Sequence, residues 1–299
     1  MKRLLIQLNV AILLLIAFSF NCMGADTYTL EYKLEKGKTY KQSMVTSTIM
    51  KMDFMGQEMS MDMKSESSIQ YDVLGQNNGI FDSRISFKKI TSSMSDPMPF
   101  NLSIDANSPE SSSEGKIYKL LNETSIEIQL TKLGKVLSVK GADALIEKIS
   151  TVGNPQLKEI LSQQISEKAI QLMVEQMSTA FPDKPVAIGD SWDVDKNLSS
   201  NGIDIISKMK LTLKQVKDNI ATLDCVGTLT TPEGGAVMNI NGMDATVSMK
   251  GVQSGTVLID VKTGWIVRSE MNNKSTQDVE VMGQTMVQNL ETKIIITAD

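Results

Sequence analysis

The feature that most constrains the fold is an internal repeat of alternating, strand-like segments. Residues 34–40 and 186–192 share one order: aliphatic residue, two residues, glycine, charged residue, hydroxyl residue, aromatic ring. Residues 70–83 and 211–224 both read as strand, Asn/Asp turn and strand, and residues 126–138 and 257–269 both place a Lys-x-Gly turn between strands. Three pairs of similar segments in the same order predict a duplicated antiparallel β-meander, although unrelated hairpins can converge on such patterns.

The repeat sets the expected fold class and boundaries. We expect a mainly β protein of the α+β kind, with duplicated antiparallel β-meanders forming a curved sheet or half-barrel and a central helical segment packed on it. The predicted parts are a signal peptide (1–24), a first repeat (27–140), a helical connector (141–183) and a second repeat (184–299). Residues 27–299 can form one domain with one continuous sheet or two small adjacent sheets. We favour one sheet.

The connector is predicted from helical periodicity between residues 142 and 181. Residues 142–149 form one short candidate helix, Asn154-Pro155 is a start signal, and Ser166 is a candidate N-cap. The last segment has an apolar stripe at three- and four-residue spacing, made of Ile170, Met173, Val174, Met177 and Phe181. We expect amphipathic helices that cover the sheet, and the alternative is a free helix that binds a partner.

Two segments have loop composition. Residues 92–113 are rich in serine and proline and should form an excursion, with a short strand at 100–104 inside it. Residues 230–236 contain Pro232-Glu-Gly-Gly235 and should form a second open loop.

Methionine is unusually frequent, with 20 residues, and six of them fall between Met50 and Met63. The segment reads as a hairpin with Gly56-Gln57 at the turn, which predicts cross-strand pairs Phe54–Met59, Met52–Met61 and Met50–Met63. One face is then wholly apolar. Residues 281–286 repeat the turn sequence with less cleanly sorted faces, so we expect an outer or edge hairpin there.

Three interpretations of the methionine-rich face remain open. It can be ordinary core, a wall that accommodates a lipid-like ligand, or a thioether site for Cu(I), which soft ligands select. The ligand-binding interpretation names these candidates: Met50, Met52, Phe54, Met59, Met61, Met63, Met173 and Met177.

The absence of histidine excludes several function classes. With 0 histidines, the chain lacks Ser-His-Asp and Cys-His catalysis, HExxH metalloprotease sites and His-ligated metals. No P-loop, dinucleotide or nucleophile-elbow motif occurs. We therefore expect no enzyme activity, no metal and no cofactor, with a carboxylate-only enzyme as a lesser alternative. Without Lys2 and Arg3, the chain carries 28 basic against 35 acidic residues, so we expect no nucleic-acid partner.

The first residues have the order of a secretory signal: Lys2 and Arg3, an apolar stretch at 4–20, then small residues at 24–25. We expect export to the periplasm or cell surface and no transmembrane helix in the mature chain. Cys22 raises an alternative, a lipid-anchored mature protein, although Asn21 and Ser19 depart from the usual lipobox. Cys225, in an alternating apolar run, should be a buried structural thiol.

One stretch supports a resemblance. Residues 181–192, Phe-Pro-Asp-Lys-Pro-Val-Ala-Ile-Gly-Asp-Ser-Trp, together with residues 260–267, resemble an uncharacterised family of exported proteins common in Bacteroidota. That resemblance implies an envelope location and transfers no functional residue. Within the 181–192 stretch, Asp190 and Ser191 should form a local turn and Trp192 should anchor a strand. A curved sheet with helices on one side is also similar to periplasmic lipoprotein-carrier and lipid-binding half-barrels.

These observations predict an exported, non-catalytic binding protein of the cell envelope for an apolar or amphiphilic ligand. The alternative is a structural or interaction module of the envelope with a protein partner. A filled core and an exposed apolar patch or open sheet edge would favour that alternative.

Overall fold

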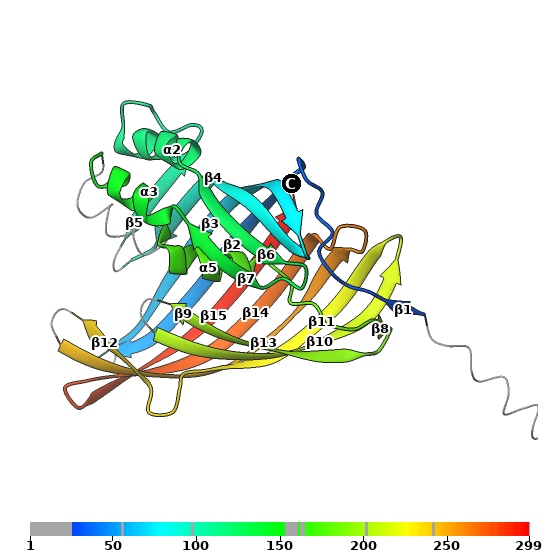
Figure 1. Ribbon diagram of the computed structural model, residues 1–299. Coiled ribbons are helices and arrows are strands. Elements are labelled where there is room, and N and C mark those ends of the chain that lie inside the picture. The colour runs from blue at the N-terminus through cyan, green and yellow to red at the C-terminus, as the bar shows by residue number, and fades with distance from the viewer. Residues whose placement is uncertain are drawn as a thin grey trace, which may run out of the picture.

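The computed structural model describes residues 26–54, 57–96, 99–152, 161, 165–200, 203–240 and 243–298. Its long strands form one antiparallel sheet that curves strongly and stays open (Figure 1). The helices gather on one side of the sheet, beside β4 to β7. The mainly β class with helices packed on a curved sheet is thus confirmed.

The strands fall into two meanders. The first contains β2 (Thr39–Phe54), β3 (Gln57–Asn77), β4 (Ile80–Met94), β5 (Phe100–Asp105), β6 (Ile126–Thr131) and β7 (Val136–Lys140). The second contains β9 (Ser191–Ser200), β10 (Ile203–Lys217), β11 (Ile220–Thr230), β12 (Ala236–Ile240), β13 (Met243–Asp260), β14 (Ile266–Val281) and β15 (Gln284–Ala298). The short strands β1 (Thr27–Tyr28) and β8 (Val186–Ala187) pair with each other.

The order across the sheet is β7-β6-β4-β3-β2-β15-β14-β13-β11-β10-β9. The two meanders therefore run in the same direction around the sheet, and β15 joins them by pairing with both β14 and β2. The expectation that the last hairpin is outer or peripheral is wrong, because β15 lies at the centre. Its exposed lysine and glutamate side chains lie on the outer face of the sheet and not at an edge.

Equivalent turns of the two meanders share their backbone conformation. Asn78-Gly79 between β3 and β4, and Asp218-Asn219 between β10 and β11, all have positive φ. Two successive residues with positive φ are typical of type I′ hairpins, whose twist matches that of the flanking strands. Met282-Gly283, with φ of 52° and 76°, makes the same turn between β14 and β15.

The register of the methionine hairpin differs from the predicted one by two residues. Met52 pairs with Met59, Met50 pairs with Met61, and Thr48 pairs with Met63, while Phe54 pairs with Gln57. The predicted pairs Phe54–Met59, Met52–Met61 and Met50–Met63 are therefore wrong. Side chains alternate with a period of two, so this shift leaves every methionine on its expected face.

The helices are α2 (Ser113–Glu123), α3 (Ala142–Ile149) and α5 (Glu167–Gln176). Helix α3 has its predicted bounds, and α5 begins after Ser166, whose hydroxyl accepts a hydrogen bond from Ala169 N. The strand predicted at 100–104 is present as β5. Helix α2 was not predicted, although Ser112 caps it. Asn154-Pro155 lies outside the described residues, as do residues 1–25 with the predicted signal peptide and Cys22.

A short N-terminal segment, residues 30–34, crosses the sheet and is called the strap below. Tyr32 N donates to Lys132 O and Lys33 N donates to Thr263 O, both at 2.8 Å. Leu30, Tyr32 and Leu34 are buried. The strap therefore holds together the two Lys-x-Gly turns, one from each meander.

An aromatic cluster surrounds Trp265, directly after the second of these turns. Its ring centroid lies 5.0 Å from Tyr40, 5.2 Å from Tyr71 and 6.2 Å from Tyr32, and Tyr32 in turn lies 5.2 Å from Phe181. Burial raises the pKa of the Tyr71 hydroxyl far above its usual range. The cluster joins both meanders, the strap and the connector in one core.

The connector also bridges the two outer strands of the sheet. Phe181 N donates to Leu133 O, next to β7, and Trp192 Nε1 of β9 donates to Ala180 O at 2.9 Å. Asp190 accepts a hydrogen bond from Ala187 N, which forms the local turn expected before β9. The two edges of the sheet are thus connected through residues 180–181.

Candidate functional site

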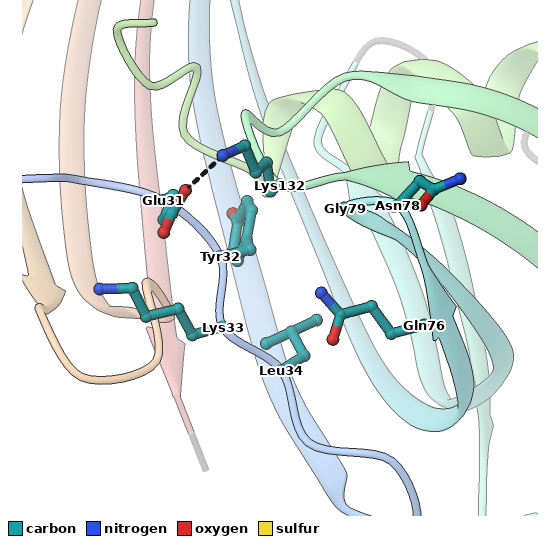
Figure 2. A pocket seen from close by; sticks show the side chains of 8 residues that line it. All are labelled: Glu31, Tyr32, Lys33, Leu34, Gln76, Asn78, Gly79 and Lys132. Carbon is teal, nitrogen blue, oxygen red and sulfur yellow. Dashed lines mark ion pairs between the residues drawn. The ribbon is translucent and has the colours of Figure 1, made fainter. Parts of the chain in front are cut away.

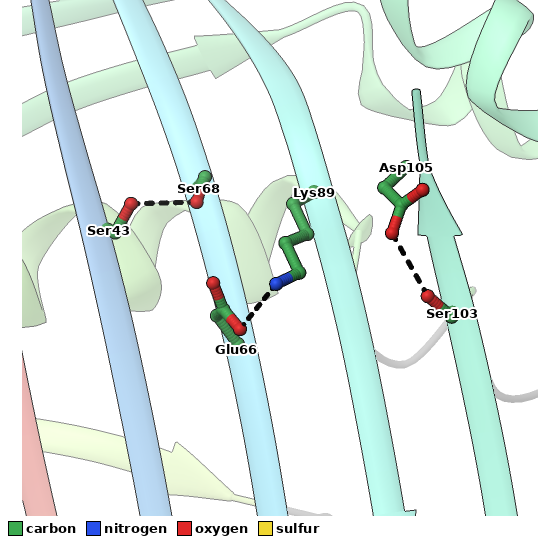
Figure 3. A network of polar contacts seen from close by, with 6 residues as sticks. All are labelled: Ser43, Glu66, Ser68, Lys89, Ser103 and Asp105. Atoms are coloured by element: carbon green, nitrogen blue, oxygen red, sulfur yellow. Dashed lines mark hydrogen bonds and ion pairs between the residues drawn. The ribbon is translucent and has the colours of Figure 1, made fainter. Parts of the chain in front are cut away.

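The two faces of the sheet differ in chemistry. The convex face carries polar side chains that pair with one another between and within strands, and Figure 3 shows some of these pairs. Lys89 Nζ lies 2.7 Å from Glu66 Oε2 and the hydroxyls of Ser43 and Ser68 lie 2.7 Å apart, each pair between two strands, while Ser103 donates to Asp105 within β5. Such pairs stabilise a solvated sheet face and form no recess. The concave face is therefore the candidate binding surface.

Methionines gather on the concave face at β2 and β3. Met50, Met52, Met59 and Met63 are half-buried, and Met61 is 6% exposed. We call these residues the methionine face. Met63 pairs with Met94 of β4, and Met50 pairs with Leu290 of β15, so the apolar surface extends over both neighbouring strands. The side chain of Phe54 lies outside the described part of the chain.

The two candidate methionines of the connector belong elsewhere. Both lie at α5, which packs against β7. Met177 is 1% exposed and lies in the main core, while Met173 is half-buried against that core. The structure thus brings the sheet methionines together and gives Met177 a packing position.

Polar side chains follow the methionine face across the concave surface. Gln253 Nε2 donates to Ser207 Oγ at 2.7 Å. The strand between them, β11, places Gly227 opposite Gln253, and the missing side chain leaves room for this hydrogen bond. Asn273 lies opposite Gln253, and the hydroxyls of Thr48 and Thr292 lie 3.0 Å apart. We call these residues the polar strip: Ser207, Gln253, Asn273, Thr292 and Thr48. The buried Oδ1 atom of Asn273 has no hydrogen-bond partner among the described residues.

Lys196 of β9 stands at the end of the polar strip, opposite Ser207. Its ammonium donates to Glu175 O at 2.7 Å, near the C-terminus of α5. Burial lowers the pKa of Lys196, partly offset by the negative charge of Glu175. Sequence reasoning missed this residue. The signal was present, because Trp192, Val194 and Lys196 alternate in phase and place a lysine on an otherwise apolar face.

Cys225 lies on the same concave face and is 2% exposed, which confirms the expected buried thiol. Burial raises the pKa of the Cys225 thiol to about 11, with a smaller contribution from the charge of Asp224. Because the thiolate is the reactive form, both burial and the raised pKa protect Cys225 at pH 8.

We expect Cys225 to resist a thiol reagent such as DTNB at pH 8 in the native protein and to react fully in guanidinium chloride. The matched control is Val226→Cys in a Cys225→Ser background, since Val226 is 55% exposed on the convex face. That control should react within seconds in the native state. Native reactivity of Cys225 equal to the control would contradict the described burial.

Two hollows lie away from the methionine face. The first, of about 450 Å³, follows the strap and is lined by polar groups, including Gln76, Lys33 and the Glu31–Lys132 ion pair at 2.9 Å (Figure 2). The second, of about 410 Å³, lies beside β9 and is lined by Phe181, Trp192 and Val194. Both are open recesses at the strap and the connector, where loops meet the sheet.

No described helix is both long and apolar enough to cross a bilayer. Among the described residues, no three carboxylate or thiol side chains come together as a metal ion would require.

Comparisons with known proteins give a family and distant structural likenesses. Residues 78–266 match the model of a family of unknown function (DUF6263). No curated protein matches the sequence. The structure of lipovitellin, described for lipid–protein interactions, aligns over 89% of this chain and 25% of that chain, at 9% identity and a TM-score of 0.49. This chain thus spans about a quarter of that chain's length.

Two further solved structures give weaker likenesses. OccK5 (OpdH) of Pseudomonas aeruginosa aligns over 88% of this chain and 99% of its own, at 6% identity and a TM-score of 0.25. A mutant porin of Rh. blastica aligns over 86% and 100%, at 7% identity and a TM-score of 0.26.

Proposed function

We propose that this chain, which belongs to the family of unknown function DUF6263, is a non-catalytic protein that binds an apolar or amphiphilic ligand on its concave face. The observation that carries the proposal is the methionine face, where four of the five side chains are half-buried on the concave side of an open sheet. A packed core of this size would bury such side chains almost completely.

The chemistry of methionine supports this choice of ligand. Its unbranched, polarisable side chain adapts to irregular apolar shapes, and proteins use it on surfaces that accept variable partners. An apolar wall with few, well-placed polar groups is also the usual composition of small-molecule sites. The adjacent polar strip supplies such groups.

We also propose that the protein works in the cell envelope. The support is the order of residues 2–25, with a basic start, an apolar stretch and small residues before the mature chain. In that compartment, an exported protein with an apolar concave face meets membrane-derived amphiphiles first.

The test is native mass spectrometry of the mature protein purified gently from a bacterial envelope, with organic extraction of the same sample. We expect an added lipid-like mass that is lost in the variant Met52→Glu, because a carboxylate at this position opposes contact with an acyl chain. Met52 is half-buried, so the protein should still fold; Met61 is too buried for this substitution.

The matched control is Ile49→Glu, on the convex face of the same strand, where the residue is 43% exposed. This variant should keep the added mass. A clean mass without ligand in a stable wild-type monomer would overturn the proposal and favour an interaction module. Equal loss in both variants would show that the effect is not specific to the concave face.

A further inference from the structure

We infer that the ligand is an anionic amphiphile, whose acidic head pairs with Lys196 while its apolar chain lies along the methionine face. This inference rests on the proposed function and adds the chemical class of the ligand and the residue that recognises its head. The ligand class covers carboxylate and phosphate heads, which share the negative charge that an ammonium binds.

Charge distribution singles out Lys196. On the described concave-facing positions of β2, β3, β9, β10, β11, β13, β14 and β15, Lys196 is the one charged side chain. Some lysines of the convex face have carboxylate partners, such as Lys89 with Glu66 and Lys274 with Glu291, and others, such as Lys208, are exposed to solvent. Lys196 has no carboxylate within ion-pair distance among the described residues, and its single hydrogen-bond acceptor there is the Glu175 carbonyl.

An ammonium group has three N–H donors, and the Glu175 carbonyl takes one of them. Removing a lysine from water is unfavourable unless an anion or several acceptors compensate for it. The lowered pKa of Lys196 has the same cause, because burial disfavours the charged form of the ammonium. The charge of Glu175 offsets this cost of burial only in part, and an acidic head group supplies a paired negative charge and further acceptor oxygens at the ammonium.

The polar strip connects this cation to the methionine face. Ser207 pairs with Lys196 and accepts from Gln253, which lies opposite Asn273, whose Oδ1 atom finds no hydrogen-bond partner in the described part of the chain. Thr292 and Thr48 continue the strip, and two residues further on the same strands lie Leu290 and Met50. A ligand with a polar end and an apolar end therefore meets matching chemistry along one surface.

Lys196 also has a structural role, because a cation near the C-terminus of α5 stabilises the helix and ties it to β9. The variants must separate the two roles. Lys196→Met keeps the apolar stem and removes the charge, while Lys196→Arg keeps the charge. Lys208→Met is the matched control, since Lys208 is exposed on the convex face of the neighbouring strand.

The experiment uses the mature protein loaded with N-phenyl-1-naphthylamine, a neutral apolar dye, which is then displaced by dodecanoate or by dodecanol. Charge-assisted hydrogen bonds predict that Lys196→Met lowers the preference for dodecanoate over dodecanol by about ten- to a hundredfold. Lys196→Arg and Lys208→Met should keep most of the preference. Far-ultraviolet circular dichroism and thermal melting of each variant verify that it folds.

The outcomes distinguish the choice of an anionic ligand from the proposed function itself. If dye, acid and alcohol all bind and Lys196→Met leaves the preference unchanged, the head-group inference fails and the proposed function stands. If neither dye nor amphiphile binds the wild-type protein, the proposed function fails with it. Displacement of the dye by inorganic phosphate alone, without an apolar chain, would overturn the inference by showing that Lys196 takes a free anion.

Discussion

Replacing Trp265 with alanine should lower the free energy of unfolding by about 3–5 kcal/mol, the usual cost of removing a buried indole. Trp265 is 7% exposed, and its ring contacts Tyr40 and Tyr71 of the first meander and Tyr32 of the strap. The substitution opens a cavity where both meanders, the strap and the connector meet. Its effect should therefore extend to the whole protein.

Chemical denaturation followed by far-ultraviolet circular dichroism measures this change without depending on tryptophan emission. Trp265→Phe is the control, because it keeps an aromatic ring in the cluster and should cost clearly less than alanine. A loss below about 1 kcal/mol for Trp265→Ala would mean that the cluster is not a shared core of the two meanders.

The second large effect is expected at Gly264. An alanine Cβ there would lie 2.2 Å from Glu31 O, and the residue has a φ of 71°. Both the left-handed backbone, at about 1–2 kcal/mol, and displacement of the strap oppose alanine, so we expect a total loss of roughly 3 kcal/mol or more.

Gly283→Ala separates the two causes. Gly283 has a similar φ of 76°, but a Cβ there meets nothing within 4 Å, so only the backbone cost of about 1–2 kcal/mol should appear. Urea titrations of both variants give the comparison. Equal losses would contradict the close contact between the strap and the second Lys-x-Gly turn.

Much of the fold could be predicted because strand alternation and turn residues are local signals. The turns at Asn78 and Asp218 lie where the repeat placed them, and α3 and α5 follow from helical periodicity and the Ser166 cap. Helix α2 was missed because residues 107–114 are dominated by serine and look like loop, and the apolar positions Ile117 and Leu121 form too short a stripe.

The register of the methionine hairpin could not be predicted from the alternation of apolar and polar residues along its strands. A shift of two residues preserves both faces, so the alternation supports either pairing equally. Turn chemistry holds the missing information: Val281 pairs with Gln284 around Met282-Gly283, and Phe54 pairs with Gln57 in the same sequence context. Glycine in the second central position is typical of a type I′ turn.

The candidate site was predicted in part. The methionines of β2 and β3 lie together on one face, as their spacing indicates. The polar strip draws one residue from each of several strands far apart in the chain, such as Ser207 and Thr48. No local sequence pattern predicts that these residues become neighbours, because their proximity depends on the order of strands in the sheet.

The central position of β15 has a consequence for how the protein reaches its native state. During synthesis, β2 emerges more than 200 residues before its partner β15, since Thr48 pairs with Thr292. Throughout that interval β2 presents an unpaired backbone edge and, beside it, the row of methionines. Slow, long-range strand pairing of this kind exposes a chain to aggregation. The nascent protein should therefore depend on chaperones until its last strand inserts between the two halves.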